Sequence, residues 1–251
     1  MTGGRDRDEP VAAAIARLID RHGLRADAAR AFASLLRALA DEHAPTTVHA
    51  AAEAVDVHLA DSLAGLEVAE LRDARTIADL GAGAGFPGLA LAVALPRTQV
   101  TLVESIARKC AFISAAAEAA GIANAVAVAS RAEEWRDGIG VNDVVTARAL
   151  APLGVLAEYA APLLREGGLL VAWKGRRDAE EERVAAAAAR ELGLAVEAVR
   201  PVAPYRGADH RHLHLLRKVA PTPERFPRRA GMARKRPLGA RVGAPSDRPH
   251  R

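Results

Sequence analysis

The sequence has few cysteines and aromatic residues, and it contains no long apolar run. Its single cysteine, Cys110, cannot form an internal disulfide bond or build a cysteine-based zinc site. No run of about 18 apolar residues occurs, and the charged start MTGGRDRDEP is not followed by an apolar segment, so neither a membrane span nor a signal peptide is predicted. We therefore expect a cytoplasmic protein with no membrane partner and no metal ion.

Positive charge is concentrated towards the C-terminus. Residues 221–251 contain nine Lys or Arg and two Asp or Glu, a net charge of +7, whereas the whole chain carries +4. The same stretch holds six of the 14 prolines and few large apolar residues. This composition predicts a poorly folded basic arm of a kind that suits a phosphate backbone. A solubilising tail without a partner is the alternative.

Apolar periodicity predicts an α/β fold that follows a helical start. Helical spacing occurs over residues 11–20 and 26–42. Short apolar runs then predict strands at residues 76–80, 99–104, 125–129, 143–147, 168–174, 194–202 and 212–219. Between these runs, residues 88–95, 107–120, 152–164 and 179–192 show helical patterns. Alternation at this spacing predicts a mostly parallel seven-stranded sheet with helices on both faces.

The stretch ADLGAGAGFPGLALA (78–92) places four glycines and one proline between two apolar runs. It lies between the first predicted strand and the following helix, at the carboxyl edge of the sheet. Glycines there let backbone N–H groups and a helix N-terminus approach a ligand closely. Asp79 and Glu104 end the first two strands, where a carboxylate can accept both hydroxyls of an adenosyl ribose. The loop therefore predicts a site for a nucleoside cofactor.

Two cofactors fit this loop. Counted from Gly81 the frame is GxGxG, whereas Gly83, Gly85 and Gly88 satisfy the GxGxxG pattern of dinucleotide sites. The apolar strand ends at Leu80, so the tight turn begins at Gly81. This position favours S-adenosyl-L-methionine, and a nicotinamide dinucleotide stays as the alternative.

Eight separated motifs resemble, in order, those of the bacterial small-subunit rRNA guanine-N7 methyltransferase G family, also called glucose-inhibited division protein B. They span roughly residues 56–238 and include the unusual Phe-Pro-Gly end of the glycine loop. One departure is residues 37–62, which hold no aromatic residue where family members usually carry several. The motifs are HLADSL (58–63), DLGAGAGFPGLALA (79–92), LVESIARKCAFI (102–113), SRAEE (130–134), VVTARAL (144–150), WKG (173–175), HLHLLRK (212–218) and FPRRAGMARKRPL (226–238).

The resemblance implies a Rossmann-like class I methyltransferase and a role for each matching residue. The domain organisation it implies is an N-terminal helical region (1–57), an adenosylmethionine-binding domain (58–220) and a basic tail (221–251). Glu104 would hold the ribose hydroxyls, and Arg148 would face the methyl group. Lys174 is a second catalytic candidate at the same edge. The residues that would contact the cofactor are Gly81, Gly83, Gly85, Phe86, Glu104, Ala132, Glu133 and Arg148.

The implied reaction is methylation of a guanine N7 in the 530 loop of 16S rRNA, on 16S rRNA itself or on the 30S subunit, by a monomer. The N7 lone pair is free at neutral pH, so the reaction needs no general base, and alignment and desolvation supply most of the acceleration. Rival hypotheses are a methyltransferase with another RNA or a small-molecule substrate, a nicotinamide oxidoreductase, and an RNA-binding protein without catalysis. His210, His212 and His214 alternate along one strand face as zinc ligands might, but no cysteine lies near them and we expect no metal site.

Overall fold

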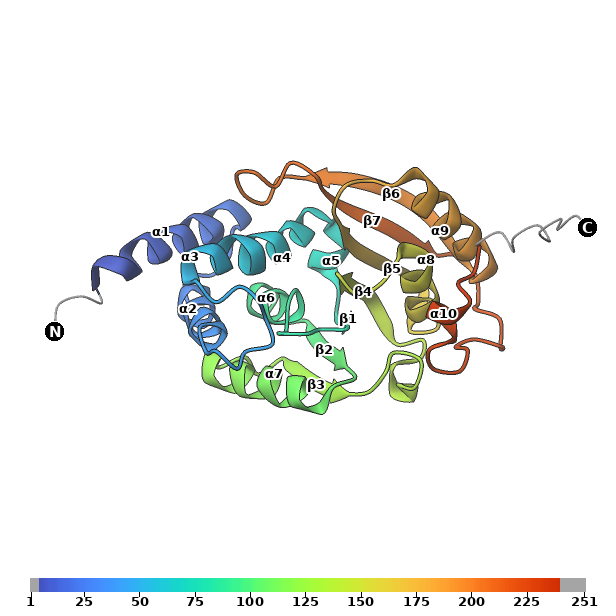
Figure 1. Ribbon diagram of the computed structural model, residues 1–251, viewed down its shortest axis with the longest axis horizontal. Coiled ribbons are helices and arrows are strands. Elements are labelled where there is room, and N and C mark those ends of the chain that lie inside the picture. The colour runs from blue at the N-terminus through green and yellow to red at the C-terminus, as the bar shows by residue number, and fades with distance from the viewer. Residues whose placement is uncertain (1–4, 240–251) are drawn as a thin grey trace, which may run out of the picture.

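The computed structural model describes residues 5–239 as a sheet with helices against both faces (Figure 1). The strand order is β3-β2-β1-β4-β5-β7-β6, and all neighbours pair in parallel except β7, which is antiparallel to both β5 and β6. This sheet confirms the predicted fold class. Its strands are β1 (Thr76–Leu80), β2 (Gln99–Glu104), β3 (Ala125–Ala129), β4 (Asn142–Arg148), β5 (Leu164–Lys174), β6 (Leu194–Val202) and β7 (Arg211–Lys218).

The strand order reverses at β1, which pairs with β2 on one side and with β4 on the other. In open α/β sheets, ligands bind beyond the carboxyl ends of the strands at such a switch point. The glycine loop follows β1 directly. The topology therefore places the loop at the preferred binding position of this fold.

The described helices confirm the predicted helical segments, and several further turns fill residues 51–73. They are α1 (Arg5–His22), α2 (Ala28–Leu39), α3 (Ala51–Ala54), a π-helical turn (Val55–Ala60), α4 (Asp61–Leu63), a 3₁₀ turn (Ala64–Glu67), α5 (Ala69–Asp73), α6 (Gly88–Ala94), α7 (Ala107–Ala120), a 3₁₀ turn (Arg136–Gly138), α8 (Leu153–Ala160), α9 (Ala179–Glu191) and α10 (Met232–Lys235). The helical run from residue 51 to 67 continues across the predicted boundary at 57 and 58. The division into three parts stays a prediction.

One predicted boundary is displaced between α8 and β5. The sequence pattern extends a helix to residue 164, whereas α8 ends at Ala160 and β5 begins at Leu164. Gly167 adopts a φ of +76°, and the pairing of β4 with β5 shifts register between Asn142 and Val144. With these irregularities β5 begins at Leu164 instead of the predicted residue 168, and α8 is correspondingly shorter than predicted.

Two apolar cores lie on opposite faces of the sheet. Along β5, Leu169, Val171 and Trp173 pack with the N-terminal helices and with α6 and α7. The alternate residues Leu170 and Ala172 pack with α8, α9 and α10. This alternation follows from the two-residue side-chain period of a strand. The N-terminal helices therefore share their core with the sheet.

The C-terminal segment from residue 221 to 239 packs against the body of the protein. Phe226 and Ala233 are buried in the core formed by α8 and α9. The guanidinium of Arg228 donates to both carboxylate oxygens of Glu158, at 2.6 and 2.5 Å, and the Glu158 side chain is only 2% exposed. The prediction of a poorly folded arm is therefore wrong for residues 221–239. It rested on charge and proline content, whereas the buried side chains of Phe226 and Ala233 and the ion pair of Arg228 hold this segment on the protein. The remaining predicted tail, residues 240–251, lies outside the described residues.

Two truncations test whether residues 221–239, unlike residues 240–251, contribute to the free energy of unfolding. Deleting residues 221–251 is expected to lower the free energy of unfolding by at least about 3 kcal/mol, because it leaves the buried Glu158 carboxylate without its partner. Deleting residues 240–251 removes none of these contacts and is the matched control. Urea denaturation of both proteins measures the difference. Equal stability of the two truncated proteins would contradict the packing role of the segment.

Candidate functional site

The glycine loop between β1 and α6 is closely packed at two glycines and open at a third. Gly81, Gly83 and Gly85 have φ values of +65°, +59° and +94°, which L-residues with side chains rarely adopt. A Cβ atom added to Gly81 or Gly85 would lie 2.5 Å from a side-chain carbon of Leu150 or Leu89, respectively. A Cβ atom added to Gly83 meets no atom closer than 3.8 Å. Gly83 therefore presents bare backbone to open space.

Glu104, at the end of β2, is attached to this loop. Its Oε2 atom accepts the N–H of Gly83 at 3.1 Å, and its Oε1 atom accepts the N–H of Ile106 at 2.9 Å. Oε1 also accepts the Ser105 hydroxyl at 3.4 Å, so about one of the four acceptor positions of an ionised carboxylate is left free, on Oε2. The residues present therefore fit the predicted ribose site, with the carboxylate next to the open face of Gly83.

Asp79 has a different role from the one its position suggested. The side chain is fully buried, and its Oδ2 and Oδ1 atoms accept hydrogen bonds of 2.9 Å from the Gly88 N–H and the Thr146 hydroxyl. The expectation that Asp79 can hold a ribose is therefore wrong, because no ligand reaches this carboxylate. Asp79 instead ties the start of α6 to β1 and β4. Burial raises its pKa to about 6, against the opposing effect of the hydrogen bonds from Thr146 and Gly88.

Asp79 makes stability depend on pH. Because its pKa is about 6 in the folded protein and 3.8 as a model value, ionisation costs free energy only in the folded state. This contribution is absent below pH 3.8 and fully developed once the pH has risen past about 6. The unfolding free energy of the native protein, relative to Asp79→Asn, is expected to fall by about 2 kcal/mol between pH 4 and pH 7. Urea titrations across this range test it, and a constant difference would contradict it.

Arg148, the last residue of β4, reaches across to the HLADSL motif. Its Nη1 atom donates to Asp61 Oδ2 at 2.8 Å and to the Val57 carbonyl at 2.9 Å, while Nη2 lies 3.4 Å from His58 Nδ1. The side chains of Arg148 and Asp61 are 16% and 5% exposed. The guanidinium is therefore held in one orientation by three groups on one helical run.

His58 connects Arg148 to the glycine loop. Burial and, to a smaller extent, the charge of Arg148 lower the pKa of His58 to about 4, so the ring is neutral at pH 7. Its Nδ1 atom faces the Arg148 donor, and Nε2 lies 3.0 Å from the Thr46 hydroxyl oxygen. This arrangement assigns the ring proton to Nε2. The ring centroid lies 5.0 Å from that of Phe86, the loop residue predicted to contact the cofactor.

A cavity of about 350 Å³ opens at the carboxyl ends of β4 and β5. The Trp173 indole N–H donates to the Asp61 carbonyl at 2.8 Å and fixes the helical run over this cavity. Lys174 also reaches the cavity, and its ammonium pairs with Glu181 at 2.6 Å. Ala149 has a φ of +54°, a conformation that costs a non-glycine residue free energy and is frequent at functional sites. The lining residues are Val57, His58, Asp61, Arg148, Ala149, Trp173, Lys174, Gly175 and Arg211.

Ala132 and Glu133 follow β3, beside the end of β2. The N–H of Ser130 donates to the Glu104 carbonyl at 3.0 Å, which places this turn next to the predicted ribose site. The Glu133 carboxylate is buried and accepts the Gly231 N–H at 2.9 Å. Its side chain thus binds the C-terminal segment, and backbone groups of the turn are left to contact an adenine.

The structure brings most of the predicted residues to one edge of the sheet. Glu104 accepts a hydrogen bond from the glycine loop, Phe86 belongs to that loop, and Arg148 and Lys174 line the neighbouring cavity. The motif HLADSL contains two functional candidates that the sequence alone does not single out, His58 and Asp61. Their spacing of three residues was the available signal, because residues three apart share one face of a helix.

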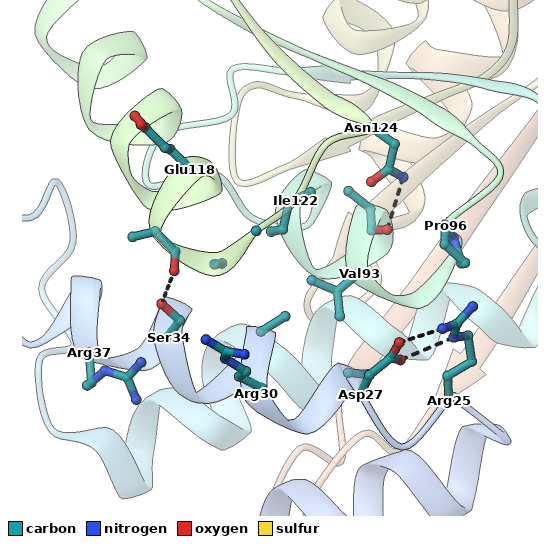
Figure 2. A pocket seen from close by; sticks show the side chains of 16 residues that line it. Arg25, Asp27, Arg30, Ser34, Arg37, Val93, Pro96, Glu118, Ile122 and Asn124 are labelled. Carbon is teal, nitrogen blue, oxygen red and sulfur yellow. Dashed lines mark hydrogen bonds and ion pairs between the residues drawn. The ribbon is translucent and has the colours of Figure 1, made fainter.

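A groove of about 610 Å³ at the opposite edge of the sheet does not belong to this site (Figure 2). Pro96 and Asn124 line it and precede β2 and β3, so the groove lies at the amino ends of these strands. Figure 2 shows Arg30 and Arg37 extending from α2 on one side of it. None of the predicted site residues lines this groove.

The histidines of β7 and the single cysteine have ordinary structural surroundings within residues 5–239. No group of three or more His, Cys, Asp or Glu side chains in this part of the chain is arranged to hold a metal ion. His212 Nδ1 lies 3.0 Å from the Gly175 carbonyl, and Cys110 is buried on α7. No helix in the described range is long and apolar enough to cross a membrane.

Comparison with known proteins decides the family. The model of the family described as rRNA small subunit methyltransferase G matches residues 25–212. The chain belongs to this family. It is 40% identical over 198 residues to ribosomal RNA small subunit methyltransferase G of Symbiobacterium thermophilum, covering 74% of this chain and 79% of the relative. The enzyme of the same name from Deinococcus deserti is 41% identical over 216 residues, covering 82% and 87%.

Solved structures share the fold of this family member at low sequence identity. Aeropyrum pernix fibrillarin, in complex with natively bound S-adenosyl-L-methionine, superposes with a TM-score of 0.51 at 18% identity over 62% of this chain and 72% of fibrillarin. The mitomycin 7-O-methyltransferase MmcR gives a TM-score of 0.53 at 16% identity over 68% of this chain and 56% of MmcR. These similarities support the fold alone.

Proposed function

We propose that this protein transfers a methyl group from S-adenosyl-L-methionine to N7 of a guanine in 16S rRNA. Family membership supports the reaction class. The observation that carries the proposal within this chain is the pairing of the open Gly83 backbone and Glu104 with an Arg148-lined cavity next to them. One half of this arrangement suits a nucleoside cofactor, and the other suits an acceptor base.

The cofactor half of the site works by shape and hydrogen bonding. The bare backbone at Gly83 leaves room for the ligand, and Glu104 accepts one ribose hydroxyl at its free Oε2 position and a second at Oε1 in place of the long Ser105 contact. Gly81, Gly85 and Phe86 shape the methionine and ribose part of the site, and the turn at Ala132 and Glu133 flanks the adenine. S-adenosyl-L-methionine, when bound, supplies an electrophilic methyl group.

The acceptor half must align a guanine and remove water from it. N7 attacks the methyl carbon with its lone pair while the carbon–sulfur bond breaks onto sulfur, so the positive charge passes to the guanine ring and no proton moves. Arg148 and Lys174 offer donors to O6 or to a phosphate while N7 stays free. Neutral His58 orients Arg148 without adding a second positive charge beside the ring.

RNA binding is supported by cations near the same edge. Arg234, Lys235 and Arg236 are consecutive and exposed on and after α10, and Arg234 donates to the Leu150 carbonyl at 2.7 Å. Leu150 itself packs on Gly81. This places a short basic surface beside the loop, where phosphates of a bound rRNA release counterions on contact. The partner is 16S rRNA or the 30S subunit, and the enzyme acts as a cytoplasmic monomer.

A transfer assay tests the function. The protein is incubated with methyl-labelled S-adenosylmethionine and either 16S rRNA or 30S subunits that lack this modification, and the nucleosides are then identified by mass spectrometry. We expect label in 7-methylguanosine of 16S rRNA alone. Label in another nucleoside, or in small molecules of a cell extract only, would assign a different substrate. Calorimetric binding of NAD without binding of adenosylmethionine would contradict the cofactor.

A further inference from the structure

Asp61 is a buried carboxylate with one oxygen left unsatisfied. Its Oδ2 atom accepts from Arg148, but within the described residues its buried Oδ1 atom has no hydrogen-bond partner. Arg211 Nε lies 3.4 Å from Oδ1 without forming a hydrogen bond, and the Arg211 side chain is 39% exposed. An unsatisfied buried acceptor costs about 1–3 kcal/mol, so it needs an explanation.

The position of Asp61 suggests what completes its hydrogen bonding. The residue lines the 350 Å³ cavity together with Arg148 and Lys174, and this volume lies within the range of small-molecule pockets. Guanine presents two adjacent donors, N1–H and the N2 amino group, next to the O6 acceptor. Adenine presents no such pair of donors. A carboxylate beside a guanidinium is complementary to this guanine edge.

We infer that Asp61 selects guanine as the acceptor base by accepting hydrogen bonds from N1–H and the N2 amino group, while Arg148 donates to O6. The inference rests on the proposed function and identifies the residue that gives it base specificity. Arg211 covers Oδ1 in the free protein and swings away when the base enters. The exchange replaces an ion pair that lacks hydrogen-bond geometry with direct hydrogen bonds from the base.

The same contact favours the reaction as well as the choice of base. Methylation at N7 leaves the guanine ring positively charged, and its N1–H and N2–H groups become stronger donors. Their hydrogen bonds to a carboxylate therefore strengthen as the transition state forms, and only such differential binding raises the rate. Asp61 is predicted to affect kcat as well as KM.

A substrate pair tests this inference. Reconstituted 30S subunits carry either guanosine or inosine at the methylated position, because inosine lacks only the N2 amino group. The native enzyme is expected to prefer guanosine by roughly 10- to 100-fold in kcat/KM. Asp61→Asn is expected to lower the rate with guanosine and to bring the ratio close to one. Glu181→Gln is the matched control, since it breaks the Lys174 ion pair at the same edge and is expected to keep the ratio.

The possible outcomes distinguish failure of the inference about Asp61 from failure of the proposed methyltransferase function. Equal loss on both substrates in Asp61→Asn, with the native ratio kept, would show that Asp61 only positions Arg148 and would overturn the inference. Equal rates of the native enzyme on guanosine and inosine would overturn it without any variant. Absence of transfer to the guanosine substrate by the native enzyme would overturn the proposed function, and the inference with it.

Discussion

Replacing Gly83 with leucine is expected to abolish binding of S-adenosylmethionine while leaving a folded protein. An added Cβ atom at Gly83 meets no atom closer than 3.8 Å, so we expect a leucine side chain to extend into the volume assigned to the cofactor. The φ of +59° adds backbone strain of about 1–2 kcal/mol, which lowers stability without unfolding the chain. Isothermal titration calorimetry measures the affinity, and denaturation measures the stability.

The control for this variant is Gly140→Leu. Gly140 has a φ of +69° and nothing within 4 Å of an added Cβ atom, so leucine at this position causes backbone strain similar to that at Gly83. It lies between β3 and β4, in the stretch before β4 begins and thus at the amino edge of the sheet. We expect a similar loss of stability and unchanged cofactor affinity. If both variants bind the cofactor as the native protein does, the assignment of the loop is wrong.

Replacing Arg148 is expected to slow methyl transfer with little effect on RNA affinity, because Arg148 is one contact among many for binding but lies at the reacting centre. Arg148→Ala should lower the single-turnover rate on 30S subunits by about 100-fold or more. It also removes the closer of the two cations paired with the buried Asp61 and leaves only Arg211 at 3.4 Å, which is expected to destabilise the fold. Arg148→Lys distinguishes a catalytic defect from a loss of stability, because lysine keeps the positive charge beside Asp61 but lacks the planar guanidinium group.

For Arg148→Lys we expect a rate loss of at least about tenfold and unchanged binding of S-adenosylmethionine. Arg165→Lys is the matched control, because Arg165 pairs with Asp143 at 2.5 Å at the amino edge of the same strands. That variant should transfer at the native rate. A native rate in Arg148→Lys would remove Arg148 from the acceptor site.

The sheet and the glycine loop could be predicted from the sequence because their signals are local. Short apolar runs mark each strand, and the end of the run at Leu80 fixed the start of the turn at Gly81. Alternation with helices indicated a mostly parallel sheet, but the order of the strands came only from the structure. Glu104 could be placed for the same reason, since the end of β2 must lie beside the end of β1 in a parallel sheet.

Contacts between distant segments could not be predicted in this way. Asp79 and Glu104 both end strands, yet only the three-dimensional packing of α6 and Thr146 buries Asp79 and leaves Glu104 beside the open loop. The charge of residues 221–239 suggested a free arm, whereas the anchors at Phe226 and Arg228 act on α8, about seventy residues away. The role of Asp61 required the approach of Arg148 from β4.

The most direct test of the proposed function is mass mapping of 16S rRNA from cells that lack the gene for this protein. We expect one guanine of 16S rRNA to lose its N7 methyl group in the deletion strain. The native gene should restore the methyl group, and a gene encoding Gly83→Leu should not. Persistence of every 7-methylguanosine of 16S rRNA in the deletion strain would contradict the proposed function.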